Sequence, residues 1–495
     1  MTTPVPESSG VAHLAVRGTL WLSLGNYVNL FIGFGATLLL ARILSPEVFG
    51  FFSMAFFWST ILSLRSKAGA NYAAIRHAGM DGTLLGTFLV VEVSLALGSV
   101  ALGVLASQLL PLAGYPADIV WPMVTLIALE LVAALGSPLS VTIERELQFG
   151  RVILLTLLSY GVGYAAALIL ALRGAGVWSL VSVNIIATVI ATSGVYWICR
   201  RHVPIVFGSR WRFDRVLARH LLRAGLPTGL SVTASGIAGQ FDNFLIGTFV
   251  GYNTLGFYDR AYRMGNWTNI LLATIVNRVA FVTYSRVRED LPRLVHAVRL
   301  SYWLLSTLGV PITLVILFGA PDLIGIIYGP AWADSAAFLP ALAAYALATP
   351  FIGVGVWLTV SLGHARMTLW LTAAQIATLV ILATPLTLRW GATGTIVGVG
   401  MTSAVGTALS CRYVLKQLHL SVREIFGVPL LSTGAAAAML TALPHLVDDQ
   451  GWQPLARLFV IGIVGPGIYL LMTLALSRSE TTRYIRYLVH RWRQA

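Results

Sequence analysis

The chain has 495 residues, of which 57% are hydrophobic and only 11% are charged, and its formal net charge is +14. An ordinary soluble domain has about 25% charged residues, and the mean hydropathy here is +0.80. These values exclude a soluble enzyme, a disordered chain and a disulfide-rich secreted scaffold. The apolar residues form long blocks separated by short basic segments, which is typical of a polytopic membrane protein.

The apolar blocks are long enough to cross a bilayer, whose hydrocarbon core of about 30 Å needs about 20 apolar residues in a helix. The first block is too long for a cleavable signal, so we expect a retained helix. The fifth and sixth are joined only by residues 173–175, which predicts a tight helical hairpin. We identify fourteen blocks, at approximately 18–40, 48–64, 83–110, 119–140, 152–172, 176–199, 224–248, 254–282, 294–318, 334–361, 367–388, 392–415, 425–446 and 455–477.

The basic residues predict the orientation of the chain. With the N-terminus inside, 27 of the 33 Lys and Arg residues fall in inside segments. Such segregation follows the positive-inside rule, so we expect both termini in the cytoplasm. It also explains the net charge without a nucleic-acid partner. The basic tail is expected to lie on anionic lipid. The six outside residues are Arg42, Arg173, Arg260, Arg263, Arg389 and Arg457.

The sequence contains an internal repeat. Residues 41–55 align with 247–261 at an offset of 206, sharing a Gly-Phe pair, and 172–176 resembles 388–394. The repeat predicts an all-α fold of two six-helix lobes in parallel, plus two C-terminal helices. Parallel repeats imply an axis along the membrane normal and a cavity between two lobes, as in alternating-access transporters. The expected parts are an N-terminal lobe (1–199), a cytoplasmic basic linker (200–223), a C-terminal lobe (224–416), an extra helix pair (417–477) and a basic cytoplasmic tail (478–495).

Two sequence motifs carry a resemblance to a known family. They are ARILSPEVFG at 41–50, and FDNFLIG at 241–247 followed by LGFYDRAYRM at 255–264. Over about 1–477, the chain resembles the Wzx-type lipid-linked oligosaccharide flippases of the multidrug/oligosaccharidyl-lipid/polysaccharide exporter superfamily. The resemblance implies flipping of an undecaprenyl-pyrophosphate-linked repeat unit across the bacterial inner membrane, for exopolysaccharide or O-antigen (lipopolysaccharide) synthesis. It also implies alternating access and, as partners, membrane lipids and a polymerase and chain-length regulator of the same pathway.

Charged residues inside the apolar blocks are candidate site residues, because an ionised side chain at mid-bilayer costs roughly 2.5–3.5 kcal/mol on insertion scales. Arg260, Arg263 and Trp267 have the spacing of one helix face, and Arg offers planar bidentate donors to a pyrophosphate. We expect a pyrophosphate and sugar cavity formed by these three residues and Asn266, with Asp242 tuning the charges. The alternative is that Asp242 pairs structurally with one arginine while the other snorkels to the headgroups.

Glu92 and Glu130 lie within the third and fourth blocks and are candidates for ion coupling. Burial disfavours an ionised carboxylate, so each could carry H+ or, alternatively, bind Na+. The alternative role is a hydrogen-bonded link between helices. No Gly-Lys P-loop, Cys/His metal cluster or nucleophile elbow occurs, so we expect no ATPase activity, no metal and no cofactor.

Two other functions remain as alternatives to a flippase. A polysaccharide polymerase or ligase would need a sizeable outer loop with His and Arg, whereas the largest outer loops, 319–333 and 447–454, hold no Lys or Arg. A multidrug exporter of the same superfamily typically has twelve helices. The span count and the first motif therefore favour a flippase over an enzyme or a drug exporter.

Overall fold

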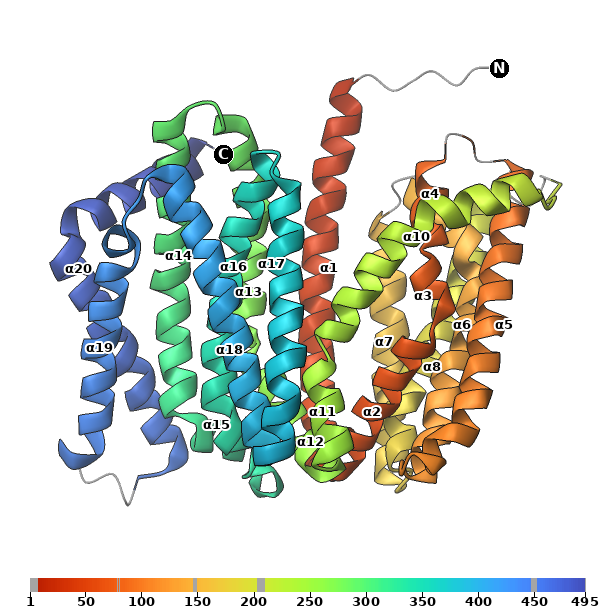
Figure 1. Ribbon diagram of the computed structural model, residues 1–495, viewed down its shortest axis with the longest axis horizontal. Helices are drawn as coiled ribbons and strands as arrows, with labels where there is room; N and C mark the ends of the chain where they lie inside the picture. The colour runs from red at the N-terminus through yellow and green to blue at the C-terminus, as the bar shows by residue number, and fades with distance from the viewer. Residues whose placement is uncertain are drawn as a thin grey trace. The chain divides into compact units, whose positions relative to one another are not determined.

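The computed structural model is almost entirely helical (Figure 1). It describes residues 8–77, 79, 81–145, 149–202, 210–446 and 452–494. Parts of the predicted linker (203–209) and of an outer loop (447–451) lie outside these residues. No strand occurs in the described residues, which confirms the all-α fold class. The chain divides into two compact units, Met1–Gly256 and Phe257–Ala495.

The N-terminal unit consists of helices that cross it side by side (Figure 1). A bilayer favours this arrangement because a helix satisfies its own backbone polar groups. Its elements are α1 (Ser8–Ile43), α2 (Pro46–Leu62), α3 (Leu64–Ala68), α4 (Ala70–Arg76), α5 (Gly82–Leu112), α6 (Ala117–Arg145), α7 (Phe149–Leu172), α8 (Val177–His202), α10 (Arg215–Ala238), α11 (Phe241–Phe249) and the start of α12 (Tyr252–Gly265). The contact between α7 and α8 confirms the predicted hairpin.

Several segments predicted to be inside meet at one end of this unit. The Arg145 guanidinium, at the end of α6, donates to the carbonyl of Gly79 at 3.1 Å. The amide of Arg212 donates to the carbonyl of Gly82, at the start of α5, at 3.2 Å. Within the N-terminal unit, these basic segments therefore share one end, as the alternation of spans predicts.

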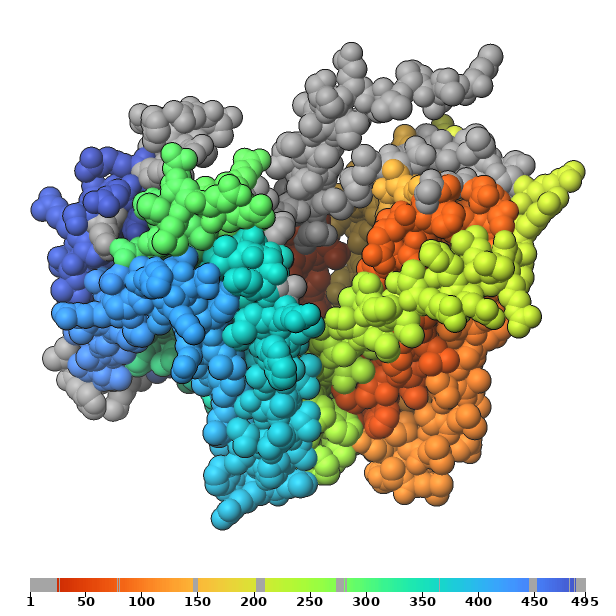
Figure 2. Space-filling model, turned by 45° about the horizontal axis from the view of Figure 1, so that its top comes forward, coloured from red at the N-terminus to blue at the C-terminus, as the bar shows by residue number. Residues whose placement is uncertain are grey.

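The second apolar block ends in two breaks rather than as one helix. α2 ends before Ser63, and Gly69 separates α3 from α4 with a φ of 57°, a left-handed conformation that favours glycine. α10 crosses this break at close range (Figure 2). A Cβ atom on Gly229 would lie 2.4 Å from the carbonyl oxygen of Lys67. Small residues thus let two helical segments approach backbone to backbone.

We predict that Gly229→Ala destabilises the protein although alanine is the better helix former. Within a helix, Gly→Ala alone should stabilise by about 0.5–1 kcal/mol, but at Gly229 the added methyl group collides with the Lys67 backbone. Gly236 is the matched control, because it lies in the same helix and a Cβ there meets nothing within 4 Å. The melting temperatures of the purified variants in detergent should move in opposite directions. Equal changes would contradict the close contact.

The two segments of the predicted repeat contact each other reciprocally within the N-terminal unit. A Cβ atom on Gly50 would lie 1.9 Å from the carbonyl oxygen of Tyr252. A Cβ atom on Gly256 would lie 1.8 Å from the carbonyl oxygen of Pro46. Both glycines and both acceptors are related by the offset of 206 found in the sequence. Such reciprocity is typical of equivalent segments related by a local two-fold axis.

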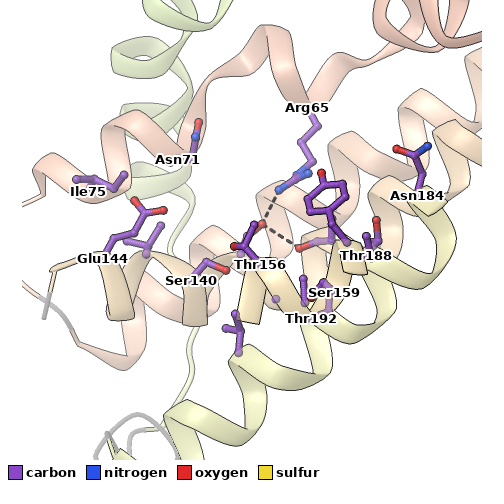
Figure 3. A pocket seen from close by; sticks show the side chains of 18 residues that line it. Arg65, Asn71, Ile75, Ser140, Glu144, Thr156, Ser159, Asn184, Thr188 and Thr192 are labelled. Carbon is purple, nitrogen blue, oxygen red and sulfur yellow. Dashed lines mark hydrogen bonds between the residues drawn. The ribbon is translucent and has the colours of Figure 1, made fainter. Parts of the chain in front are cut away.

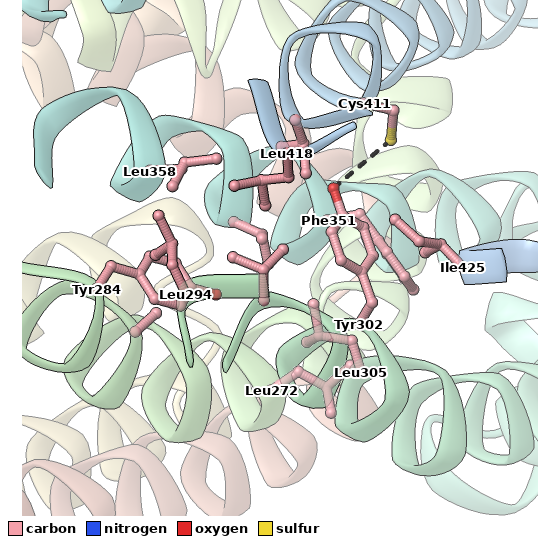
Figure 4. Close-up of a cluster of buried hydrophobic side chains, with 14 residues drawn as sticks. Leu272, Tyr284, Leu294, Tyr302, Leu305, Phe351, Leu358, Cys411, Leu418 and Ile425 are labelled. Atoms are coloured by element: carbon pink, nitrogen blue, oxygen red, sulfur yellow. Dashed lines mark hydrogen bonds between the residues drawn. The ribbon is translucent and has the colours of Figure 1, made fainter. Parts of the chain in front are cut away.

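The C-terminal unit contains the remaining helices. They are the end of α12, α13 (Trp267–Val287), α14 (Leu291–Phe318), α15 (Ala320–Ile327), the 3₁₀ turn η1 (Pro330–Trp332), α16 (Ser335–Ser361), α17 (Ala365–Thr378), the π-helical turn η2 (Leu379–Ala383), α18 (Thr384–Leu418), α19 (Val422–Leu446) and α20 (Pro454–Gln494). A core of buried side chains joins α13, α14, α16 and α18 (Figure 4). There the Tyr302 hydroxyl lies 3.8 Å from the Cys411 sulfur.

Two expected spans are interrupted in the structure. The block at 224–248 is divided at Gly239 and Gln240 into α10 and α11, and the block at 254–282 is divided at Asn266 into α12 and α13. Glycine is a poor helix former, and α11 then begins with Asp242 in its first turn, where a helix dipole favours a negative charge. Apolar length alone did not reveal these breaks.

The number of membrane-spanning helices depends on how the longest apolar helices are divided. Among the described residues, nine helices are long and apolar enough to cross a membrane, and two apolar helices are shorter. One of the nine, Arg366–Leu418, reverses direction at Gly391, whose φ is 59°. The Thr387 and Thr395 hydroxyls, 2.8 Å apart, join its two arms. This turn falls between the predicted blocks 367–388 and 392–415, while the total of fourteen stays a prediction.

Candidate functional site

The N-terminal unit contains a polar cavity of about 350 Å3, bounded by α3, α4, α6, α7 and α8 (Figure 3). Its volume lies within the range of about 300–1,000 Å3 found for ligand pockets. Glu144, Asn71 and Ile75 lie toward one end of the view, and Asn184 lies toward the other. Hydroxyl side chains that line the wall include Ser137, Ser140, Thr156, Ser159, Thr188 and Thr192.

Small residues on α6 and α8 shape the cavity. Gly136 lets α8 approach closely, since a Cβ there would lie 3.2 Å from the Thr192 methyl group. Ala133 and Ala187 line the wall without filling the space. On α7, the Ser159 hydroxyl donates to the carbonyl of Leu155 at 2.6 Å. A hydroxyl that donates to its own helix keeps lone pairs, so its oxygen can still accept a hydrogen bond from a cavity ligand.

Arg65 joins the cavity wall to a buried carboxylate. Its Nε donates to Glu92, whose side chain is only 2% exposed, and its Nη2 donates to the Ser137 hydroxyl at 2.7 Å. The Ser137 hydroxyl also lies 3.1 Å from Glu92. The network ties α3, α5 and α6 together. Arg65, the partner of Glu92, directly follows the predicted second block, 48–64.

Glu130 lies on α6, two turns before Ser137. In the described part of the chain, its Oε2 is buried and has no hydrogen-bond partner. Ser63, Ser99, Arg65 and Glu92 lie close enough to act on it. The Ser63 hydroxyl, however, donates to Ser66 at 2.9 Å, and the Ser99 hydroxyl donates to the Leu95 carbonyl at 3.0 Å. An ionised Glu130 would therefore depend on these two hydroxyls, and its Oε2 would still lack the donor that a buried charge requires.

The C-terminal unit contains a second charged cluster, on α12. Asp259 pairs with the Arg260 guanidinium and accepts from the Arg263 Nε at 3.0 Å. Asp259 and Arg260 are both 3% exposed, whereas the Arg263 side chain is 56% exposed. Two arginines share this carboxylate, and the three residues together carry a formal charge of +1. The i, i+4 spacing of Asp259 and Arg263 is a helical pairing signal that the sequence contained.

The other predicted site residues lie near the helix breaks. Asp242 is buried in the first turn of α11 and belongs to the N-terminal unit, so its expected effect on the arginines stays a prediction. Asn266 separates α12 from α13 and accepts a hydrogen bond from Asn269 at 3.0 Å. Trp267 is the first residue of α13. Asn266 keeps helical backbone angles, and its amide and carbonyl make i, i+4 hydrogen bonds to Tyr262 and Ile270, so the shared face of Arg260, Arg263 and Trp267 stays a prediction.

Two solved membrane proteins have a fold similar to that of this chain. The structure of the lipid II flippase MurJ, in an inward closed conformation, matches with a TM-score of 0.70 and 15% identity, covering 93% of this chain and all of that one. An inward-facing multidrug resistance MATE family transporter of the MOP superfamily matches with a TM-score of 0.60 and 16% identity, covering 81% and 99%. At such identities the likeness establishes the fold: a multi-pass membrane protein of the MurJ and MATE type.

The sequence comparisons identify the family. A profile of the family described as "Polysaccharide biosynthesis protein" matches residues 39–337, so the chain belongs to that family. The succinoglycan biosynthesis transport protein ExoT of Rhizobium meliloti (strain 1021) is 28% identical over 329 residues, or 65% of this chain. The match spans 64% of that relative's length. The resemblance to polysaccharide exporters inferred from the motifs is confirmed.

We predict that Arg65→Ala strongly destabilises the protein, because it leaves Glu92 charged, buried and unpaired. Breaking a buried ion pair by removing one partner costs about 3–5 kcal/mol. The double variant Arg65→Ala, Glu92→Ala should recover part of this loss, because it removes both charges. Arg293→Ala is the control, since Arg293 and Asp290 form an exposed pair and such pairs contribute little. Melting temperatures in detergent provide the measurement, and a double variant no more stable than Arg65→Ala would contradict the pairing.

Proposed function

We propose that the protein is a flippase that moves a lipid-linked saccharide across the membrane during polysaccharide synthesis. The polar cavity of the N-terminal unit carries this proposal. Polar groups inside a bilayer are costly, and where they occur they commonly line a path or a site for hydrophilic cargo. Family membership and the transporter fold support the same function. An exopolysaccharide repeat unit is the proposed cargo, by extension from the named role of the succinoglycan relative.

The proposed lipid carrier is undecaprenyl pyrophosphate, held through the α12 cluster. Asp259 fixes the Arg263 Nε, and more than half of the Arg263 side chain is exposed. The net positive charge of the cluster favours a pyrophosphate, and the planar guanidinium matches its oxygens. Asp242, Asn266 and Trp267 are proposed as further residues of the carrier site, on the strength of the sequence pattern.

The proposed driving force is a proton gradient acting through Glu130. Glu92 is already bound to Arg65, whereas Glu130 has a buried oxygen that no described residue contacts by a hydrogen bond. A metal cation would need several oxygen ligands, whereas a proton needs only the carboxylate itself. In this scheme Glu92 positions Arg65, and Glu130 takes up and releases the proton.

We further propose the bacterial inner membrane as the location, with both termini in the cytoplasm. The basic segments that meet at one end of the N-terminal unit support this orientation. Membrane lipids, and a polymerase and chain-length regulator of the same pathway, are the proposed partners. No nucleic acid and no enzymatic activity are part of this proposal.

We predict that Arg263→Ala reduces transport of the lipid-linked saccharide strongly while the protein remains abundant, because the Asp259–Arg260 pair survives. Arg263→Lys should be intermediate, since it keeps the charge but loses the bidentate fork. Asp259→Asn should instead lower abundance, because it leaves Arg260 buried without its carboxylate. Export by complemented cells, with membrane protein levels quantified, provides the measurement. Arg389→Ala, at an exposed arginine, is the control, and normal export by Arg263→Ala would contradict the carrier site.

We predict that Glu130→Gln uncouples transport from the proton gradient. The amide keeps the size of the side chain but cannot exchange a proton, so the protein should fold and lose its response to an imposed pH gradient. Glu47→Gln, at an exposed carboxyl on α2, is the control and should respond as the wild type does. Transport in proteoliposomes with and without the gradient tests this. A Glu130→Gln variant that the gradient still accelerates would refute the coupling role.

A further inference from the structure

The charges around the N-terminal cavity differ from those of the α12 cluster. Arg65 is the arginine on the cavity wall, and Glu92 already neutralises it. Glu144 lines the cavity near its exposed end and adds a negative charge. The cavity therefore has no excess positive charge to attract a pyrophosphate. Its ligand should instead be neutral and hydrophilic.

The uncharged side chains of the wall provide both hydrogen-bond donors and acceptors. Asn71, Ser140 and Thr188 line the cavity and make no hydrogen bond to the described part of the chain. Asn184 donates weakly to the carbonyl of Leu180, at 3.4 Å, and keeps its own carbonyl oxygen. Tyr160 adds an aromatic ring. Amides and hydroxyls can donate and accept at once, as the hydroxyl groups of a sugar require.

We propose that this cavity binds the saccharide part of the lipid-linked cargo, as neutral sugar residues beyond the one attached to the pyrophosphate. The inference rests on the proposed function and adds the chemistry of the ligand and its place in the N-terminal unit. Arg65 is a positioning residue in this site: Glu92 and Ser137 fix its guanidinium on the cavity wall. Thr188, Asn184 and Ser140 contact the sugar.

If the cavity holds the outer sugars, blocking it should affect a large saccharide cargo and spare a small one. Thr188→Phe places a ring in the cavity, whereas Val189→Phe, at the next position of α8, adds the same ring at a residue that is 47% exposed. Thr188→Phe should slow transport of the intact lipid-linked saccharide by roughly tenfold or more, as the loss of a good binding interaction does. Transport of the carrier with only its first sugar should be unchanged, because that substrate lacks the sugars that the proposed site binds.

The experiment uses the full-length protein in liposomes and the lipid-linked saccharides extracted from cells that make it. One sample is intact, and the other is trimmed enzymatically to the sugar next to the pyrophosphate. Asn184→Leu is the second variant, because it keeps the side-chain size but removes the amide. It should slow the intact cargo selectively, as Thr188→Phe does. It also tests the site if Thr188→Phe fails to insert into the membrane. Val189→Phe should move both samples as the wild type does.

The outcomes separate this inference from the proposed function. Selective loss of the intact cargo in Thr188→Phe or Asn184→Leu supports the saccharide site. Equal slowing of both cargoes would overturn the saccharide site and would favour a structural role or a water-filled access path to Glu130. Normal transport of both cargoes would also overturn the saccharide site. If the wild type moves neither cargo, the proposed function itself fails, and the saccharide site fails with it.

Discussion

The pairing of buried charges is the constraint on which the rest of this protein depends. In a bilayer, an ionised side chain needs a partner or water. In the described residues, the pairing of Arg65 with Glu92 and the sharing of Asp259 by two arginines meet this need. Each ion pair neutralises part of the formal charge of its cluster, and the charge that remains differs between the two clusters. Around the N-terminal cavity the remaining formal charge is neutral to negative, whereas on α12 it is positive. The two units therefore offer different chemistry to a ligand.

Interrupted helices put these charges in place. The breaks at Ser63 and Gly69 turn α3 so that Arg65 reaches across to α5 and α6. The close approach of α10 to Gly69 fixes that turn from outside. In the C-terminal unit, α12 ends at Gly265, immediately beyond its charged cluster. The α12 cluster itself depends on the i, i+4 spacing of Asp259 and Arg263 within one helix.

The contrast between Glu92 and Glu130 shows how the environment separates two similar residues. Both are carboxylates in apolar spans of the same unit. Glu92 is bound by a guanidinium, and the Ser137 hydroxyl lies within hydrogen-bonding distance of it, so it serves the architecture. Glu130 lies near the Ser63 and Ser99 hydroxyls, but its Oε2 is buried and accepts no hydrogen bond in the described part of the chain, and it has no guanidinium of its own. The proposed division into a positioning residue and a proton carrier follows from these partners.

The sequence by itself determined the helical class, most spans, the α7–α8 hairpin, the repeat and the family resemblance, because apolar length, turn residues and motifs are local properties. It also marked Glu92, Glu130, Arg260 and Arg263 as costly charges in a membrane. Only the tertiary structure decided that Arg65 is the partner of Glu92 and that α6, α7 and α8 enclose a polar cavity. The physical reason is that spans identify which residues enter the bilayer, whereas partners depend on helix breaks, rotation and neighbours, which long-range packing sets.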